Sequence, residues 1–193
     1  MKGVIMGKVS WKPGNMLYPV PVVMVSSKKK GENKRPNIVT VAWAGTICSD
    51  PVMLSISVRP ERYSHEIIEE TGEFVVNLVT EELTESCDWC GVRSGRKFDK
   101  FRERNLTEYY SEYMETPAIA ESPVNLYCKV VKTERLGAHD MYIAEIVGVT
   151  VDDRYMDEEG KFDLEKAGLV AYSHGAYHAL GEKLGTFGFS VKK

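Results

Sequence analysis

The sequence predicts a mainly β protein, built as a closed or partly closed antiparallel barrel with a few short helices. Short runs rich in β-branched and aromatic residues recur along the chain, separated by turn-like segments, while helical signals are few. These runs do not alternate regularly with helices, as the strands of a parallel α/β sheet do. An antiparallel barrel is the architecture that such a succession of strands favours.

Six β-rich runs are expected to form the strands. Pro19 and Pro21 mark the first run as an edge strand or as the entry to a strand. A Ser-Asp-Pro turn separates the second run from the third, and the last two runs flank a turn that contains Gly137. We expect strands over residues 18–26, 37–47, 52–59, 73–79, 125–133 and 141–151.

The segment between the first two strands reads Lys-Lys-Lys-Gly-Glu-Asn-Lys-Arg, over residues 28–35. Gly and Asn in a charged segment are typical of a turn. We expect an exposed hairpin tip here, because its five cations are solvated more easily at a tip than in any packed position.

Two short helices are expected after the third strand. Ser64 can cap a helix that runs through Glu70 and ends at Gly72. Thr80 can cap a second helix, whose first turn has favourable acidic side chains. One face of this second helix would carry Leu83, Cys87 and Cys90.

Length and composition indicate one globular domain over residues 1–193, with 43% hydrophobic and 27% charged residues. A net charge of -3 gives no whole-molecule attraction to nucleic acid. No apolar run is long enough to span a membrane, and the first residues lack a signal-peptide core. We therefore expect a cytoplasmic protein. Four cysteines in a chain of this length do not indicate a secreted disulfide scaffold.

The segment 37–65 is the most informative for function. In it two β-rich runs flank the Ser-Asp-Pro turn, and the second run leads into the first expected helix. Such an element places small residues, a flat indole and a helix N-terminus around one cleft, which is what a planar, phosphorylated ligand requires. The G-x-G-x-x-G and G-x-x-x-x-G-K-[ST] patterns of dinucleotide and triphosphate sites do not occur in the chain.

Three residues have both a structural and a functional interpretation. Trp43 lies among small residues of its strand, either as a core tryptophan or as an aromatic wall against a planar ring. Asn37, at the start of that strand, is a turn residue or a ligand contact. His139 lies at the mouth of the last expected hairpin. Its side chain is either structural or exposed, or it donates a hydrogen bond to a ligand oxygen.

Ser64 and Lys100 are candidate phosphate contacts. An N-cap serine and the exposed amides beside it can receive a phosphate oxygen without losing the capping role. Arg59 and Arg62 precede Ser64 and either add charge or are simply solvated. The segment 93–101 is basic and aromatic, but it is short and diluted by acidic residues. It suits the presentation of Lys100 to one phosphate better than nucleic-acid binding.

Cys87 and Cys90 form a C-x-x-C pattern. A redox pair normally lies in a β-helix-β context, which this chain lacks. A structural zinc ion would need two more ligands, and Cys48 and Cys128 are distant in sequence. We favour two packed thiols beside Leu83 and expect no metal site.

In their order and spacing these segments resemble the flavin reductase-like family, which has the FMN-binding split-barrel fold, an antiparallel Greek-key barrel. Within that family the chain is most similar to flavoredoxin and the archaeal ferric reductases. The similarity covers about residues 18 to 191. The matching motifs are Asn37-Ile38-Val39-Thr40-Val41-Ala42-Trp43, Ser49-Asp50-Pro51, Tyr63-Ser64, Phe74-Val75-Val76-Asn77, Ser94-Gly95-Arg96, Asp99-Lys100-Phe101, Gly137-Ala138-His139 and Tyr172-Ser173-His174.

The resemblance implies a non-covalently bound FMN and assigns its contacts position by position. Asn37 and Trp43 would contact the flavin, Ser64 would bind the phosphate with neighbouring amides, and Lys100 would neutralise it. The full set of expected cofactor contacts is Asn37, Val41, Ala42, Trp43, Ala44, Ser57, Val58, Arg59, Ser64, Asn77, Ser94, Lys100, His139 and Tyr172.

The same resemblance implies an NAD(P)H-dependent flavin or ferric reductase, in which NADH or NADPH passes hydride to the bound FMN. No side chain need act as an obligatory acid or base, and His139 and Tyr172 would tune the ring or gate its face. The family is typically homodimeric, with the flavin near the subunit interface. One alternative is a flavoredoxin-type electron carrier that a partner protein reduces; another is a β-barrel interaction module with a vestigial pocket.

Overall fold

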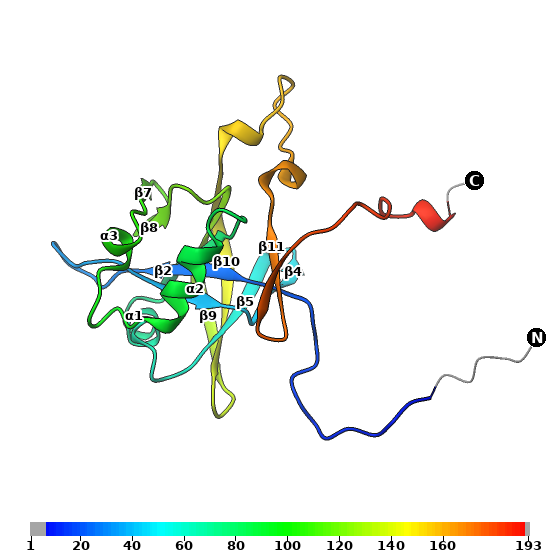
Figure 1. Ribbon diagram of the computed structural model, residues 1–193. Helices are drawn as coiled ribbons and strands as arrows, with labels where there is room; N and C mark the ends of the chain where they lie inside the picture. The colour runs from blue at the N-terminus through cyan, green and yellow to red at the C-terminus, as the bar shows by residue number, and fades with distance from the viewer. Residues whose placement is uncertain (1–6, 192–193) are drawn as a thin grey trace, which may run out of the picture.

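The computed structural model describes residues 7–191 and contains a curled, seven-stranded antiparallel sheet (Figure 1). The strand order is β3-β2-β6-β9-β10-β5-β4, so the mainly β, antiparallel half-barrel that the sequence predicts is confirmed. The strands are β2 (Val23–Ser27), β3 (Asn37–Val41), β4 (Ala44–Ser49), β5 (Val52–Val58), β6 (Glu73–Leu78), β9 (Val124–Arg135) and β10 (Asp140–Val151).

Two smaller sheets flank the main one, and most of their strands were not expected from the sequence. β1 (Val20–Pro21), β11 (Val170–Ser173) and β12 (Ala176–Ala179) form the first, and β7 (Glu108–Ser111) pairs with β8 (Met114–Ile119) in the second. The turn between β11 and β12 places His174 and Gly175 at φ 48° and 84°. Two consecutive positive φ angles are typical of a tight hairpin turn.

The expected second strand, 37–47, is two strands in the structure. β3 ends at Val41 and β4 begins at Ala44, so Ala42 and Trp43 form a corner between them. The backbone N–H of Ser57 donates to the carbonyl oxygen of Trp43 at 2.9 Å and fastens this corner to β5. Because β3 and β4 are the two edges of the sheet, the corner joins the edges where the barrel closes.

The helices are α1 (Tyr63–Thr71), α2 (Thr84–Val92) and α3 (Lys100–Glu103), with 3₁₀ turns η1 (Asp153–Tyr155), η2 (Leu164–Ala167) and η3 (Phe189–Val191). Gly72 ends α1 in the left-handed conformation, as expected, but the N-cap is Arg62 and Ser64 lies inside the first turn. Thr80 caps a turn that precedes α2, because its Oγ1 accepts from the N–H of Leu83 at 3.3 Å. α2 therefore begins one turn later than expected.

Alternate residues of β2 and β3 pack into two different cores. Val25 and Val39 point into the interior of the curled sheet, whereas Met24 and Ile38 point to the opposite face, which α2 covers. The period-2 alternation of a strand explains why all five residues of β2 are buried. The segment 28–35 between these strands is the exposed hairpin tip that the sequence predicts.

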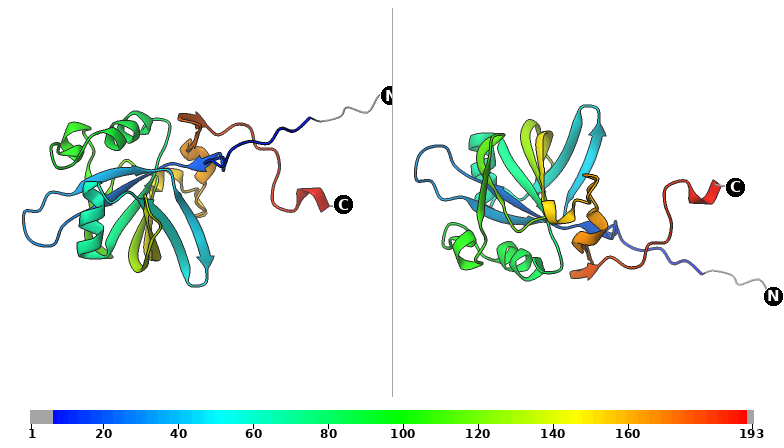
Figure 2. Two further views of the ribbon diagram at one scale, coloured as in Figure 1. Left: turned by 90° about the horizontal axis from the view of Figure 1, so that it is seen from below. Right: turned by 90° about the horizontal axis from the view of Figure 1, so that it is seen from above.

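Two terminal arms, residues 7–17 and 180–191, leave the body on the same side (Figure 2). Both carry exposed apolar side chains, among them Trp11, Leu17, Leu184 and Phe187. Contiguous apolar surface of this kind is unusual on a monomer and typical of an interaction surface. Within residues 7–191, no helix has the length and apolar character that crossing a membrane requires.

Asn77, which was expected to contact a cofactor, has a structural role in the core. Its side chain is 0% exposed. Its Oδ1 accepts hydrogen bonds from the N–H of Ile119 and from Nδ2 of Asn125, both at 2.9 Å. Its Nδ2 donates to the carbonyl oxygen of Met24 at 2.9 Å. The amide is thus fully used in tying β2, β8 and β9 to β6.

We predict that Asn77→Ala lowers the free energy of unfolding, because it leaves the buried N–H of Ile119 without a partner, at roughly 1–3 kcal/mol, and removes one of the two hydrogen bonds that Nδ2 of Asn125 donates. Urea denaturation measures the change. Thr46→Ala, at an exposed strand position, is the control and should shift stability by less than about 0.5 kcal/mol. A folded Asn77→Ala protein of unchanged stability would contradict the structural role.

Candidate functional site

A cavity of about 450 Å³ opens where the β3–β4 corner meets the end of β5. We call it the larger cavity. The corner is rich in small and β-branched residues, so the backbone itself forms much of the floor. The chain therefore offers close backbone approach to a flat ligand, as the sequence predicts. Its lining from these two elements comprises Val39, Thr40, Val41, Ala42, Trp43, Ser57, Val58 and Arg59.

Trp43 is an aromatic wall of the larger cavity and not a core residue. It is 41% exposed, because the strand pattern breaks at the corner where it lies. The ring of His139 lies against it, with 4.4 Å between ring centroids and an interplanar angle of 46°. The β9–β10 hairpin brings His139 here from a distant part of the sequence, so both side chains bound the same space.

The buried carboxylate of Asp140 holds the hairpin that carries His139. Asp140, 5% exposed, accepts a hydrogen bond from Nε2 of His65 at 2.6 Å and pairs with Arg135. The hydrogen bond from His65, more than the nearby Arg135 guanidinium, lowers the pKa of the Asp140 carboxyl. For His139 itself, partial burial and the cation of Arg59 lower the pKa. The imidazole of His139 is therefore neutral at pH 7 and can both donate and accept a hydrogen bond.

Three tyrosines also line the larger cavity. Tyr172 was expected here, and it lies with its ring centroid 6.4 Å from that of Tyr18 and 5.4 Å from that of Tyr177. Tyr177 donates to Asp88 at 3.0 Å, which fixes the β11–β12 hairpin against α2. Tyr18 and Tyr177 were missed from the sequence. The aromatic repeat Ala-Tyr-Ser-His-Gly-Ala-Tyr-His was the available signal.

A second cavity of about 120 Å³ adjoins the first, and we call it the smaller cavity. Val39 and Arg62 line both, so the two form one connected site. The smaller cavity is polar and cationic where the larger one is aromatic. It lies at the N-terminus of α1, against the 93–95 loop. Its further lining comprises Asn37, Glu61, Tyr63, Ser64, Cys90, Arg93, Ser94, Gly95 and Lys100.

Asn37 and Ser64 are buried together at the base of the smaller cavity. Nδ2 of Asn37 donates to Oγ of Ser64 at 2.7 Å, and the two residues are 3% and 1% exposed. Oδ1 of Asn37 has no hydrogen-bond partner among the described residues. Gly95 packs directly on this amide, since a Cβ there would lie 1.9 Å from Oδ1. Only glycine therefore lets the loop pass so close to Asn37.

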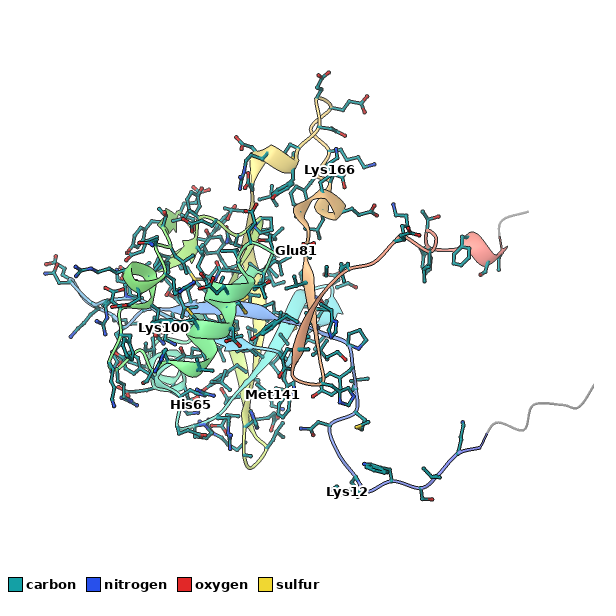
Figure 3. All side chains as sticks on the ribbon, viewed as in Figure 1. Lys12, His65, Glu81, Lys100, Met141 and Lys166 are labelled. Carbon is teal, nitrogen blue, oxygen red and sulfur yellow. The ribbon has the colours of Figure 1, made fainter. Side chains whose placement is uncertain are left out.

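Lys100 begins the short helix α3 and points into the body of the molecule beside α2 (Figure 3). Its Nζ donates to the carbonyl oxygens of Ile38 and Cys90 at 2.6 Å each, so it ties β3 to α2. An ammonium has three donors, which leaves one for the smaller cavity that Lys100 lines. Burial, at 2% exposure, lowers the pKa of Lys100 to about 8.

The smaller cavity has more cations than anions. Within residues 7–191, no carboxylate lies at salt-bridge distance from Arg62, Arg93 or Lys100. Glu61, the acidic residue of the lining, pairs instead with Arg59 at 2.9 Å. Three cations without a carboxylate partner around a space of about 120 Å³ form a site for a compact anion.

The two connected cavities bring together most of the residues that the sequence singled out. Asn77 lies in the core and lines neither cavity, and Ala44 lines a different cavity, beside the N-terminal arm. Arg62, which the sequence left open, lines both cavities and donates to the carbonyl oxygen of Gly91 at 3.1 Å. The residues that line the larger or smaller cavity as expected are Asn37, Val41, Ala42, Trp43, Ser57, Val58, Arg59, Ser64, Ser94, Lys100, His139 and Tyr172.

Cys87 and Cys90 lie on the buried face of α2, where their free thiols pack with Leu83. Burial raises the pKa of Cys87 to about 12 and that of Cys90 to about 11. The thiolate form, which redox exchange and metal binding need, is therefore disfavoured. The interpretation of this pair as packed thiols is confirmed.

Residues 15–181 match the model of the flavin reductase like domain. An uncharacterised protein of Archaeoglobus fulgidus is 33% identical over 159 residues, which cover 82% of this chain and 86% of that protein. A ferric-chelate reductase (NAD(P)H) from the same organism is 26% identical over 106 residues, 54% of this chain and 62% of that protein.

Solved structures agree with the sequence comparisons. Flavoredoxin of Desulfovibrio vulgaris superposes with a TM-score of 0.87 at 29% identity, covering 96% of this chain and all of that one. A split-barrel protein from Shewanella frigidimarina, 24% identical, superposes with a TM-score of 0.78, over 89% of this chain and 86% of that one, and supports the fold alone. With its curled sheet, its two connected cavities and these matches, the chain belongs to the flavin reductase-like family and has the split-barrel fold.

Proposed function

We propose that the protein binds FMN without a covalent bond, with the ring system in the larger cavity and the phosphate in the smaller one. The observation that carries this proposal is the pairing of two unlike cavities. An aromatic-walled space and a cationic space share Val39 and Arg62 as common lining. A ligand that fills both must be planar and apolar at one end and anionic at the other, which describes a flavin mononucleotide.

The residues of the smaller cavity fit a phosphate group. Ser64 and the N-terminus of α1 supply donors, and Arg62, Arg93 and Lys100 supply charge. The two ends of an amide side chain are assigned from their hydrogen-bond partners. In the alternative orientation of Asn37, Oδ1 accepts the one hydroxyl proton of Ser64, so Nδ2 of Asn37 replaces that hydroxyl as the free donor in the cavity. The orphaned atom of Asn37 then has a partner when an anion is bound.

The chain's residues would bind and orient the cofactor. Trp43, His139 and Tyr172 all bound the ring space. Neutral His139 can donate to an oxygen of the ring system, and backbone near Val41 and Ala42 can approach the ring edge. When bound, FMN supplies hydride and single-electron chemistry, and the protein contributes orientation and electrostatics.

We infer that electrons come from NADH or NADPH and pass through the flavin to an acceptor such as ferric iron or free flavin. The curated relative from Archaeoglobus fulgidus, a ferric-chelate reductase (NAD(P)H), supports this activity. The similarity to flavoredoxin supports a second candidate, an electron carrier that a partner protein reduces. The size of the larger cavity, about 450 Å³, disfavours a vestigial pocket in a pure interaction module.

Removal of the Lys100 charge is expected to weaken FMN binding selectively. A charge-assisted hydrogen bond is worth roughly 1.5–3 kcal/mol, so Lys100→Met should raise the Kd for FMN by about 10- to 150-fold. Riboflavin, which lacks the phosphate, is the matched control ligand and should change by less than about threefold. Fluorescence titration of the apoprotein measures both. Equal losses for FMN and riboflavin would show that Lys100 has only a structural role.

The same lysine gives FMN binding a pH dependence. Because the pKa of Lys100 in the free protein is about 8, the cation is lost as the pH rises above 8. A bound phosphate favours the charged form, so the FMN affinity should fall above pH 8, by at most about tenfold per pH unit. Lys100→Met should remove this fall. An FMN affinity that stays constant to pH 9.5 in the unmodified protein would contradict it.

Anaerobic addition of NADH or NADPH to the FMN-loaded protein decides between the two candidate functions. Prompt bleaching of the flavin absorbance is the expected result. A flavin that remains oxidised under excess of either nicotinamide, but is reduced by dithionite, would overturn the reductase and favour the carrier. A protein that gains no bound-FMN absorbance on reconstitution would overturn both.

We further infer a homodimer in which the terminal arms cover apolar surface on a second copy. Leu184 and Phe187 on the C-terminal arm are 93% and 104% exposed, and Leu17 on the N-terminal arm is 87% exposed, which is unusual for a free monomer. Light scattering should give twice the chain mass of 21.7 kDa. The double variant Leu184→Glu with Phe187→Glu should shift the mass towards the monomer, whereas the control Thr186→Glu should not. A monomeric unmodified protein would refute the dimer.

A further inference from the structure

A basic surface adjoins the smaller cavity. It is made of six exposed cations from two segments, the β2–β3 hairpin tip and the loop after α2. Nη2 of Arg35 donates to the carbonyl oxygen of Gly95 at 2.8 Å and joins the two segments. The surface comprises Lys30, Lys34, Arg35, Arg93, Arg96 and Lys97.

This surface begins at the mouth of the candidate site. Arg93 and Gly95 line the smaller cavity, and Arg96 stacks over Tyr63 of the same lining at 4.9 Å from the ring centroid. From there the cations continue to the hairpin tip, which projects from the body at the left of Figure 1. The positive area therefore extends well beyond what one phosphate or one small ligand covers.

Little of this charge is neutralised locally. Arg96 pairs with Glu66 at 2.8 Å. Across the described chain, 7–191, the other five cations of the basic surface have no carboxylate at salt-bridge distance. Negative charge is concentrated in a different part of the molecule. The segment 152–165, at the top of Figure 1, has seven acidic and two basic residues. The molecule is thus electrically polarised, with its positive end at the site.

The chemistry of the surface favours an acidic protein over nucleic acid. Its aromatic neighbours are already covered by its own arginines, Arg96 over Tyr63 and Arg93 over Phe98, so these rings are not free to stack on bases. The net charge of -3 and the acidic segment 152–165 add long-range repulsion for a polyanion. A compact acidic protein can contact the positive end alone and avoid that repulsion.

We propose that the basic surface docks a small acidic electron-transfer protein, which exchanges electrons with the bound flavin through the adjoining site. This proposal rests on the proposed function, because it assigns the partner of the same flavin. In one turnover the two-electron-reduced flavin reduces two ferric centres of the partner to ferrous, one electron each. The flavin returns to its oxidised form and its protons go to water. Charge complementarity steers the encounter and sets its rate.

Charge reversal at the tip tests the proposal. The variant Lys30→Glu with Lys34→Glu changes the basic surface, and neither residue lines the larger or smaller cavity. The matched control, Lys129→Glu with Lys161→Glu, makes the same change in net charge at exposed positions elsewhere. The FMN-loaded proteins are reduced with dithionite, desalted and mixed anaerobically with an oxidised rubredoxin as the acidic probe. Stopped-flow absorbance gives the second-order rate constant at low and high salt.

The tip variant should lower this rate constant about tenfold at low ionic strength, and 0.5 M salt should abolish the difference. The control should stay within about twofold of the unmodified protein. With cytochrome c, a basic acceptor, the tip variant should react faster than the unmodified protein. These three results together would support an acidic partner at this surface.

Equal rubredoxin rates for the tip variant, the control and the unmodified protein would overturn the proposal. Salt-sensitive binding of a single-stranded RNA, lost in the tip variant while the rubredoxin rates stay equal, would assign the surface to nucleic acid instead. Failure of the proposed function would give a different result. The unmodified protein would then show no bound-FMN absorbance, and this is measured before any mixing. Docking itself is then measured on the apoprotein, by the chemical shifts of zinc-substituted rubredoxin.

Discussion

The corner at Ala42 and Trp43 is the constraint on which the rest of the site depends. Here the chain passes from one edge strand of the sheet to the other, and the N–H of Ser57 holds the carbonyl oxygen of Trp43 at 2.9 Å. Closure at this point brings the ends of β3 and β5 side by side and leaves a space between them. A strand that continued straight through residue 43 would bury the indole and fill that space. The larger cavity is therefore a direct result of how the barrel closes.

The smaller cavity is formed by polar groups that the fold buries at a cost. Lys100 loses most of its hydration, which lowers its pKa to about 8, and Asn37 retains an unpartnered oxygen. These groups also hold the structure, because Lys100 joins Ile38 to Cys90. Under the proposed function, Lys100 would combine this structural role with phosphate binding.

The sequence predicted the fold class, the main strands and most of the residues around the two cavities. Its failures have local physical causes. Ser64 looked like an N-cap because serine is a common cap, but its hydroxyl pairs with Asn37, which lies far from it in sequence. Asn77 ends one of the motifs that carry the family resemblance, yet its amide is used by β2, β8 and β9, contacts that no local pattern shows. Tyr18 and Tyr177 were missed because long-range pairing of β1 with β11 and of β11 with β12 is needed to bring them to the cavity.

The protein has a net negative charge but carries a region of positive charge at one end, and the position of the unpaired cations explains this. Like charges repel, so Arg62, Arg93 and Lys100 around the smaller cavity destabilise the free protein unless an anion lies among them. A phosphate dianion would neutralise this inner group, whereas among the outer cations of the basic surface only Arg96 has a carboxylate partner within residues 7–191. Under the proposals made above, the inner cations would bind the phosphate of the cofactor and the outer cations would bind a partner protein. One continuous positive region would then place the cofactor next to the protein that exchanges electrons with it.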